Sequence, residues 1–485
     1  MRVFLYSSFV LKFVKRCAPV AFLGMLGLAY AEPAAPAVCP EGVIVSSIGF
    51  EGLKHTKPRV VERELRNRVG EPFSQENFEI EKARLQDLDL FTEISVSCTS
   101  GLDSSTSFTS AGSVNSAQND VGAVRLTYHF KEIFRWIPAP AGKKTDRDGL
   151  MLGAALANLN LLGEDIRAEV QYRTTVDPFF DKNEYALYVS SPYLFGFPLG
   201  WNFEFLVTDS YDNIRGFQEN SILLDMDLDY KFMPNLSLLG TAAYRYLDGM
   251  ANLPEFGLGF AFDYRDSKLD TRNGVYFEYM LTHVGVGEEV VAFCAGDYEF
   301  AGSWDDSWDG PGDNPKNCCG KSCGENYWEL LTDARAYKTF GRFVTGATAL
   351  VRYRPGEVKF YDYYYHGGAN TFRGHEADSG SLGVHEALLT LEERFVLMER
   401  HAASLWGINF FYGLQLVAGL DGSLLWDKGR PGWENYEGAV YGGIHLVIPA
   451  LDRVRFEVGY SPDRGEPVFY FGLFDKVTSS RWRSR

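Results

Sequence analysis

One glycine-rich loop carries the residues whose types and spacing are most informative about chemistry. Its sequence is Gly-Gly-Ala-Asn-Thr-Phe-Arg-Gly-His, in which the fixed cation Arg373 is accompanied by Gly367, Gly368 and Gly374. Glycine lets a backbone turn sharply, and a guanidinium can donate paired, charge-assisted hydrogen bonds to carboxylates. Lysine lacks this planar fork. The loop therefore has the chemistry of an ion-pairing element.

Two acids in the segments after this loop are candidate partners of Arg373. In the alternating run 385–397, Glu392 falls on the face that we expect to point inward. The run 411–421 ends in Asp421, which is the natural inward acid of that segment. An arginine with acidic partners inside a closed sheet indicates a loop that folds back into a barrel.

A second charged motif lies in a turn between two other alternating runs. It contains Asp263, Arg265 and Asp266 and ends at Gly274. Asp263 and Arg265 share one face, and the glycine relaxes the backbone where the next strand begins. Taken alone, this motif is compatible with an ordinary charged turn.

The spacings of common catalytic sites are absent from the sequence. His366, His375 and His385 lie near acids, but neither His-Glu pair has a histidine three residues later, so the zinc-protease pattern fails. The segment 142–145 lacks the upstream glycine of a phosphate loop, and there is no Gly-x-Ser-x-Gly elbow. We therefore expect no enzymatic activity, no cofactor and no metal site.

The elements that must position these motifs are strands. From about Gly149 to Phe474, apolar and polar residues alternate almost throughout. Eleven runs precede the Arg373 loop and five follow it, which gives the even total of a single-chain outer-membrane barrel. The runs are 149–158, 163–173, 183–191, 199–209, 216–230, 235–247, 254–264, 274–284, 286–300, 326–339 and 342–354, then 385–397, 411–421, 437–448, 451–460 and 467–474. We predict an all-β transmembrane barrel of sixteen antiparallel strands over residues 149–474. A soluble β-sandwich or propeller is the alternative, but no blade-like repeat is visible.

A small α+β unit is predicted ahead of the barrel. Residues 1–31 have the basic start, apolar stretch and Ala-Tyr-Ala end of a secretory signal, with an N-terminal membrane anchor as the alternative. The further expected segments are an Ala/Pro linker at 32–41, the small domain at 42–131 with a flexible insertion at 99–120, and a basic C-terminal tail at 475–485. Within the small domain we expect a helix over 58–69 and a second helix from the N-cap Ser74 to about Asp87.

Cysteine usage and charge restrict the compartment and the partners. Six cysteines remain after the signal, namely Cys39, Cys98, Cys294, Cys318, Cys319 and Cys323. In a secreted chain disulfides are the default. Cys39 and Cys98 flank the small domain and can pair, but connectivity stays open, and zinc binding by the last three cysteines is the alternative. A net charge of −17 argues against a nucleic-acid partner.

Two segments of the small domain resemble a known family. Ile48-Gly49-Phe50-Glu51-Gly52 and Leu88-Asp89-Leu90-Phe91-Thr92-Glu93-Ile94 are similar to the hallmark segments of a POTRA (polypeptide-transport-associated) domain. Together with the Asp263–Gly274 hairpin, the Arg373 loop and the five runs after it, they make the chain resemble the BamA/TamA family of outer-membrane assembly proteins. The resemblance covers the small domain and most of the barrel.

The resemblance implies a sixteen-stranded barrel whose sixth outer loop enters the lumen. There the loop arginine meets acids on strands 12 and 13, which are Glu392 and Asp421 in this sequence. The chain departs from the family where Phe372 replaces a valine and His375 an aromatic residue. It also has Asp421-Gly-Ser where Asp-x-Gly is usual. These departures put a housekeeping role in doubt more than the fold.

The resemblance also implies a function. We expect the protein to insert and fold β-barrel or other polypeptide clients in the outer membrane, with the POTRA domain in the periplasm. The expected partners are unfolded clients, the lipid bilayer, and periplasmic or lipoprotein accessory subunits. A lateral seam is predicted between a first strand near 149–158 and a last strand near 467–474. The residues expected to shape this seam are Gly465, Pro467, Phe469, Phe471 and Phe474.

Three other functions remain open from the sequence. A dedicated translocator of the two-partner type commonly has two POTRA domains and a plug helix, and neither is evident. A mitochondrial-type sorting-and-assembly barrel also has one POTRA domain, but the bacterial-type signal argues against it. A passive porin or adhesin would need neither a POTRA domain nor an arginine-held loop.

Overall fold

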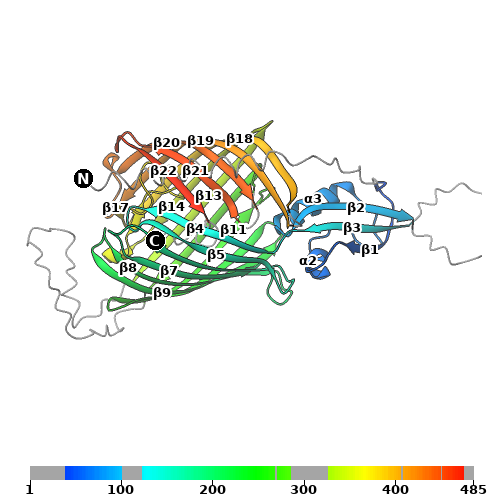
Figure 1. The fold of residues 1–485 in the computed structure, drawn as a ribbon, viewed down its shortest axis with the longest axis horizontal. Coiled ribbons are helices and arrows are strands. Elements are labelled where there is room, and N and C mark those ends of the chain that lie inside the picture. Colours follow the sequence, from blue (N-terminus) through cyan, green and yellow to red (C-terminus); the bar gives the residue numbers. More distant parts are fainter. Residues whose placement is uncertain are drawn as a thin grey trace, which may run out of the picture.

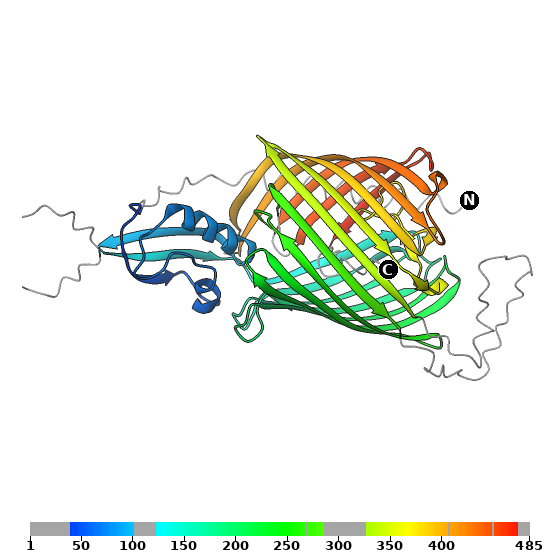
Figure 2. The same cartoon turned by 180° about the vertical axis from the view of Figure 1, so that it is seen from behind.

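The computed structural model describes residues 39–100, 123–267, 270–285, 326–405, 408–448 and 451–473. The predicted signal, the tail, and most of the linker and of the insertion lie outside these residues, as do Phe474 and the four cysteines from Cys294 to Cys323. Among the described residues, no helix has the length and apolar character to cross a membrane. The molecule is elongated, with a small N-terminal domain at one end of a long barrel (Figures 1 and 2).

The small domain is a three-stranded sheet with two helices. Its elements are β1 (Val45–Glu51), α2 (Pro58–Glu62), α3 (Gln75–Asp87), β2 (Phe91–Ser100) and β3 (Val124–Glu132). The central strand β3 pairs in parallel with β1 and antiparallel with β2. Its Leu126 and Tyr128 are fully buried and belong to the same apolar cluster as Val60, Val61 and Leu85 of the helices. Ser74 caps α3 as predicted, because its side chain accepts the Asn77 N–H.

The first helix is shorter than the sequence predicts. It ends at Glu62 rather than near Val69, which is exposed. The reason is the buried carboxylate of Glu81, which accepts the backbone N–H groups of Arg66 and Asn67. A backbone that donates to this carboxylate leaves the helical path, because a buried acid requires hydrogen-bond partners.

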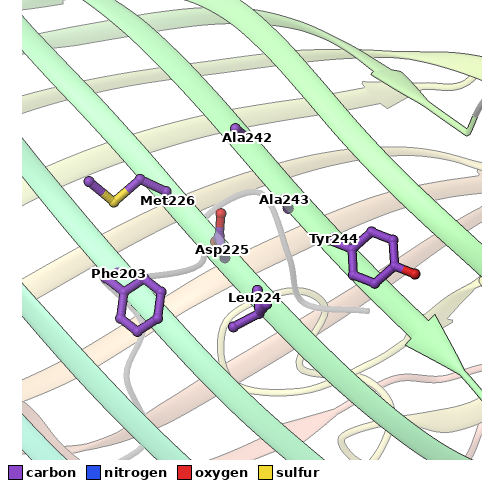
Figure 3. A pocket seen from close by; sticks show the side chains of 7 residues that line it. All are labelled: Phe203, Leu224, Asp225, Met226, Ala242, Ala243 and Tyr244. Atoms are coloured by element: carbon purple, nitrogen blue, oxygen red, sulfur yellow. The ribbon is translucent and has the colours of Figure 1, made fainter.

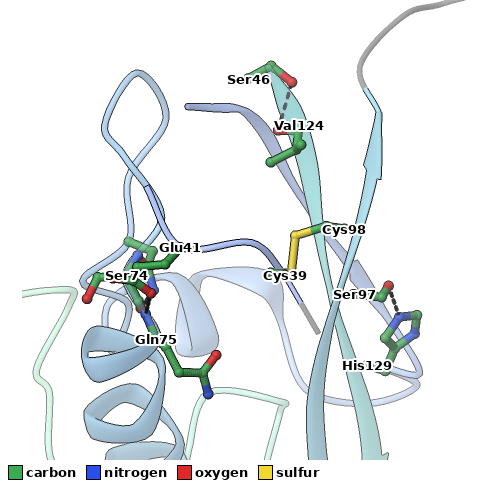
Figure 4. The surroundings of a disulfide bond; sticks show 10 residues. Cys39, Glu41, Ser46, Ser74, Gln75, Ser97, Cys98, Val124 and His129 are labelled. Carbon is green, nitrogen blue, oxygen red and sulfur yellow. Dashed lines mark hydrogen bonds between the residues drawn. A yellow bond between two sulfur atoms is a disulfide. The ribbon is translucent and has the colours of Figure 1, made fainter. Parts of the chain in front are cut away.

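A disulfide joins Cys39, which precedes β1, to Cys98 of β2 (Figure 4). The two half-cystines are separated by 59 positions in the sequence. Closing a loop of this length restricts the unfolded chain and stabilises the folded domain by about 4 kcal/mol in the chain-entropy model. The pairing that the sequence left open is thus observed for these two cysteines.

The described part of the barrel consists of sixteen long antiparallel strands, which confirms the predicted fold class. They are β4 (Trp136–Thr145), β5 (Gly149–Leu161), β6 (Ile166–Thr175), β7 (Lys182–Ser191), β8 (Leu199–Asp212), β9 (Phe217–Met233), β10 (Leu236–Leu247), β11 (Ala251–Asp263), β12 (Gly274–Val284), β13 (Asn326–Phe340), β14 (Phe343–Tyr353), β18 (His385–Leu405), β19 (Ile408–Trp426), β20 (Tyr436–Ile448), β21 (Leu451–Tyr460) and β22 (Pro467–Leu473). Each pairs with its sequence neighbour, and β22 returns to β4 to close the ring.

Two of the individual strand assignments need correction. The first barrel strand is β4, which the sequence analysis missed, and not the strand near residue 149. The predicted run 286–300 lies outside the described residues, and β12 pairs directly with β13 over eleven residue pairs, so no strand stands between them. The two differences compensate, and the total stays at sixteen.

Side chains alternate between the two faces of the barrel wall. A hollow on the wall shows this alternation, with Leu224 and Tyr244 on one face and Asp225 and Ala243 on the other (Figure 3). Leu224 and Tyr244 are exposed, whereas Asp225 and Ala243 are buried. Apolar side chains outside and polar side chains inside are the pattern of a transmembrane barrel.

Residues 354–384, which we call the inner loop, connect β14 to β18. The loop contains β15 (Gly356–Glu357), the 3-10 helix η2 (Phe360–Asp362), β16 (Tyr364–His366) and β17 (Ser379–Gly383). A second 3-10 helix, η3 (Trp433–Asn435), lies between β19 and β20. The inner loop lies at the barrel end far from the small domain (Figures 1 and 2). Its residues Tyr364 and Phe372 are fully buried.

Candidate functional site: the inner loop and the barrel seam

The guanidinium of Arg373 lies inside the barrel among carboxylates from the wall. Its Nη1 donates to Asp421 Oδ1 at 2.9 Å, and its Nε donates to Glu457 Oε2 at 3.2 Å. The Nη2 atom is 4.0 Å from Glu392 Oε2. The carbon of the guanidinium lies 3.7 Å from the ring centre of Tyr441, a cation–π distance. These contacts fix the position and the plane of the Arg373 side chain.

The carboxylates around Arg373 keep its guanidinium protonated. Burial by itself lowers the pKa of the guanidinium, but the carboxylates of Glu457 and Asp421 raise it, so that the pKa lies above its ordinary value. Asp421 also accepts the backbone N–H of Arg373 at 3.1 Å and the hydroxyl of Thr390 at 2.7 Å. Backbone and side chain of Arg373 are thus held by the same acid.

Glycines allow the loop to approach the wall. At Gly367 and Gly368 the φ angles are +98° and +124°, a region that side chains other than glycine rarely adopt. A Cβ atom at Gly374 would come within 2.3 Å of the Phe372 ring. On the wall, a Cβ at Gly459 would lie 1.8 Å from the Arg373 carbonyl oxygen, so this strand position also requires glycine.

The rest of the inner loop is anchored by arginines and tyrosines around the lumen. Arg354 donates to Glu329 at 2.7 Å and to the Asp362 carbonyl at 2.6 Å, and Arg245 lies 2.5 Å from the Asp362 carboxylate. Arg215 donates to the Tyr361 carbonyl at 2.6 Å. The loop therefore spans the lumen from wall to wall, and its position depends on many strands at once.

The predicted hairpin motif lies at the opposite end of the barrel, where Ser267 donates a hydrogen bond to Asp87 of the small domain. Arg265 Nε and Nη2 each lie 2.8 Å from an oxygen of Asp263, and Asp266 accepts the backbone N–H of Asn273 at 3.0 Å. Gly274 has a φ of +113°, and a Cβ there would lie 2.1 Å from the Tyr264 carbonyl oxygen. These contacts make the motif a rigid turn.

A single buried arginine links this hairpin to the Arg373 site. Arg394 of β18 is fully buried and lies 3.3 Å from Asp270 of the hairpin and 3.4 Å from Glu392. Glu392 in turn is the more distant carboxylate near Arg373. On one face of β18, the negative Glu392 and the positive Arg394 thus connect the Arg373 loop to the 263–274 hairpin.

The seam between β22 and β4 has few pairings. Within the described residues only Gly472 pairs with Lys143 and Leu473 with Gly142, whereas β4 and β5 form ten pairs. Continuing the same register would pair Phe471 with Lys144, but that pair is not formed. The closure of the described barrel therefore rests on two residue pairs.

Two prolines limit the seam from the β4 side. The Leu159 N–H donates to the Arg135 carbonyl. Along β4, the backbone N–H and C=O groups of odd-numbered residues therefore point toward β5, and those of even-numbered residues point toward the seam. Pro138 and Pro140 are even-numbered and have no N–H group to donate. The seam edge of β4 therefore lacks two backbone donors.

The inner loop bridges the part of the seam where pairs are missing. The hydroxyl of Tyr470 on β22 donates to the His375 carbonyl at 2.6 Å. On the other side, Lys144 of β4 lies 3.1 Å from the Glu376 carboxylate, and the Asp146 N–H donates to the Ala377 carbonyl at 2.8 Å. Three consecutive loop residues thus contact the last barrel strand, the first barrel strand and the residue that follows it.

The structure brings together only some of the residues predicted for these sites. Arg373, Asp421 and, at longer range, Glu392 converge. Among the predicted seam residues, Gly465 lies in the turn before β22 and Pro467 pairs with Tyr460 of β21. Phe469 and Phe471 are exposed side chains of β22, and Phe474 lies outside the described residues.

Sequence reasoning missed Glu457, His445 and the bridging segment 375–377. Glu457 is fully buried and binds His445 Nε2 at 2.7 Å as well as Arg373. The alternation of the run 451–460 places Glu457 on the inner face, so this acid could have been found. Two of the three bridging contacts are made by backbone carbonyls, which leave no residue-type signal.

Comparisons with known proteins concern the small domain and the fold. Residues 43–132 match the POTRA family model, described as a surface antigen variable number repeat. No curated protein sequence matches the chain.

Solved structures share the fold at low identity. CdiB from Escherichia coli is 14% identical with a TM-score of 0.53, covering 89% of this chain and 76% of CdiB. CdiB from Acinetobacter baumannii is 11% identical with a TM-score of 0.51, covering 89% and 73%. BamA from Haemophilus ducreyi lacking POTRA domains 1-3 is 13% identical with a TM-score of 0.48, covering 89% and 84%. The chain thus combines a domain that matches the POTRA family model with a sixteen-stranded antiparallel barrel, and it shares the fold of the two CdiB structures.

Proposed function

We propose that this protein is an assembly factor that inserts and folds β-barrel or other polypeptide clients in the outer membrane. The observation that carries the proposal is the seam, where two residue pairs join the first and last described strands. In a bilayer each unsatisfied backbone group costs several kcal/mol, so spanning sheets normally close completely. The end of the seam at which Phe471 and Lys144 do not pair is an edge that can open at low cost.

The proposed mechanism uses backbone pairing and no cofactor. When β4 and β22 separate, their free edges can pair with the strands of a client, which thereby enters the bilayer with its backbone groups satisfied. The driving force is the folding of the client itself. The segment 375–377 bridges the two strands, so the inner loop must shift at this point before the seam can open.

The POTRA domain supplies a place for clients before insertion. In its sheet β3 is central, so β1 and β2 are the outer strands. An extended polypeptide can add to such an edge through main-chain hydrogen bonds, independently of its sequence. With the domain in the periplasm, a client held there is close to the barrel end that carries the 263–274 hairpin.

A dedicated translocator is the second candidate because the fold is shared with CdiB. A translocator passes its substrate through the lumen. In the described residues the lumen is crossed by the inner loop, which is held by Arg354, Arg245 and Arg373. This occupancy favours lateral assembly over passage through the pore.

The proposal is tested by depleting the protein and measuring the outer-membrane proteome. We expect the loss of many barrel proteins, restored by the wild-type chain and poorly by Arg373→Ala. Loss of a single secreted protein would instead establish the translocator. An unchanged proteome would reject both functions and leave a passive porin or adhesin.

A further inference from the structure

Three side chains with metal-binding donors meet beside the bridging segment. His366 at the end of β16, His375 after the Arg373 turn and Glu437 of β20 each place one donor atom within 4.8 Å of the other two. The two histidines lie nine positions apart in the inner loop and Glu437 comes from a later strand, and neither histidine belongs to a His-Glu-x-x-His pattern. Two imidazoles and one carboxylate are a donor set typical of zinc sites that keep a fourth position open.

The imidazole of His366 is held in one orientation. The residue is fully buried, and its ring stacks on Phe372 with 4.9 Å between centroids and 16° between planes. Its Nδ1 forms no hydrogen bond and lies 3.7 Å from Glu386 Oε1. Histidines that bind metals commonly direct the second ring nitrogen to a carboxylate. In this orientation Nδ1 faces Glu386, and Nε2 is the atom left for a metal.

His375 and Glu437 complete the set on the more open side. His375 Nε2 is 2.5 Å from Glu437 Oε2, and the side chains of the two residues are 17% and 30% exposed. A zinc ion needs about 2.0–2.2 Å to each donor, so the pair has to separate by less than about 1 Å to admit it. Their partial exposure provides an entry path and room for a water ligand.

The surrounding charges are compatible with a cation. The nearest fixed cation along the chain, Arg373, is directed away from this cluster toward Asp421 and Glu457. The carboxylate of Asp146 interacts electrostatically with His375, and that of Glu376 is paired with Lys144.

We propose that His366, His375 and Glu437 form a binding site for a divalent transition metal, with Zn²⁺ as the best fit to this donor set. The metal would tie the inner loop to β20. Because the His375 carbonyl also accepts the Tyr470 hydroxyl, the same ion fixes the segment that bridges the seam. This inference goes beyond the proposed function and does not depend on it.

The test is metal binding by the refolded, full-length mature protein in detergent. Cys294, Cys318, Cys319 and Cys323 are replaced by serine, because thiolates also bind zinc. We expect one Zn²⁺ per chain by calorimetry, and the visible spectrum of a tetrahedral Co²⁺ complex with nitrogen and oxygen ligands. His366→Ala and Glu437→Gln should each weaken binding at least tenfold, since each removes one of three protein ligands.

A matched control and a folding check make the outcome decisive. His129 lies 3.2 Å from Glu51 in the POTRA domain and has the same donor types outside the cluster, so His129→Ala should bind Zn²⁺ like the parent. Heat-modifiable gel migration verifies that each variant has folded. Equal Zn²⁺ binding by the parent and a folded His366→Ala/Glu437→Gln double variant would overturn the site, as would no binding by the parent. Client insertion is not measured, so neither result bears on the assembly function.

Discussion

The side chain of Arg373 has a geometry that no other residue type can reproduce. Two nitrogens of one planar group reach Asp421 and Glu457 on different strands, and the face of the same plane rests on Tyr441. A lysine ammonium is a point charge and cannot make this arrangement. Removing one partner of a buried ion pair leaves the other charge without compensation, which is the costly event.

We therefore predict that Arg373→Ala lowers the stability of the folded loop by about 3–5 kcal/mol, and that Arg373→Lys recovers only part of this loss. Urea unfolding of the refolded protein, together with protease cleavage within the inner loop, measures the change. Arg430→Ala, at an exposed position, should have no effect. The pairing is wrong if Asp421→Ala and Glu457→Ala are both silent while Arg373→Ala is not.

Gly459 tests the docking of the loop without changing any charge. Its added Cβ would lie 1.8 Å from the Arg373 carbonyl oxygen, a backbone atom that cannot move aside alone. Gly459→Ala should expel residues 372–374 from the wall and raise protease sensitivity as much as Arg373→Ala does. Gly438→Ala is the control, because the nearest atom there is 3.6 Å away. Equal protease resistance of the two glycine variants would show that the backbone of Arg373 is not packed against β21.

At the scale of elements, α2 of the POTRA domain docks on the turn between β5 and β6. Asp165 in this turn is buried and accepts a hydrogen bond from Arg63 Nη2 at 2.8 Å. The neighbouring Glu164 lies 2.5 Å from Lys57 Nζ and also contacts Arg59. Thr56 accepts a further hydrogen bond from Asn160 at 2.8 Å. The domain and the barrel are thus joined by a polar interface.

This interface should strengthen as pH falls. Burial raises the pKa of Asp165 to about 7, and Glu64 adds to this, although Arg167 and Arg63 oppose it. At pH values between 3.8, the ordinary pKa of an aspartate, and about 7, Asp165 is protonated in the docked state and ionised in the separated state. Docking therefore takes up a proton, and it becomes more stable as the pH falls from 8 to 5. Energy transfer between dyes on the two domains measures docking. Asp165→Asn should remove the pH dependence, and an interface that loosens at pH 5 would contradict the prediction.

A strand can be predicted from the sequence when its side chains alternate between the lumen and the outer face and it contains no proline. Period-two alternation located most strands, because inward polar and outward apolar side chains are required along the whole wall. It failed at β4, where Pro138 and Pro140 are atypical of a paired strand. Those prolines are tolerated because the nitrogens face the seam rather than β5. The strand that escaped prediction is therefore the one with an incomplete edge.

The same distinction holds for the residues of the site. Arg373 and Asp421 could be paired from the sequence because a loop cation and an inward acid differ in type from their neighbours. The side chain of Glu457 also points inward, but many acids line the lumen. Only the position of the inner loop determines that Glu457, rather than another acid, binds Arg373. In the bridge from His375 to Ala377, two of the three contacts use carbonyl groups, and these two could not be predicted from side-chain types.

At the scale of the whole molecule, the barrel is closed by two different devices. Most neighbouring strands are joined by continuous ladders, which are insensitive to the loss of any single contact. Among the described residues, two backbone pairs and three contacts from the inner loop join β22 to β4 and to the residue after it. A change that moves the loop therefore acts on the seam, and Arg373 connects the two because it anchors the loop two residues before His375.

A disulfide across the seam tests whether the edge must open for client insertion, because it prevents opening and leaves the fold of the barrel unchanged. Lys143 and Gly472 are directly paired, so the double variant Lys143→Cys, Gly472→Cys can join the strands covalently without moving them. If clients enter through this edge, the oxidised protein should lose most of its ability to insert a client barrel into liposomes, and a reductant should restore it. The control is the pair Leu206→Cys, Leu223→Cys, which joins β8 to β9 at an already continuous ladder and should leave insertion unchanged. Full activity of the oxidised seam variant would place client entry elsewhere, since a covalently joined edge cannot accept a new strand.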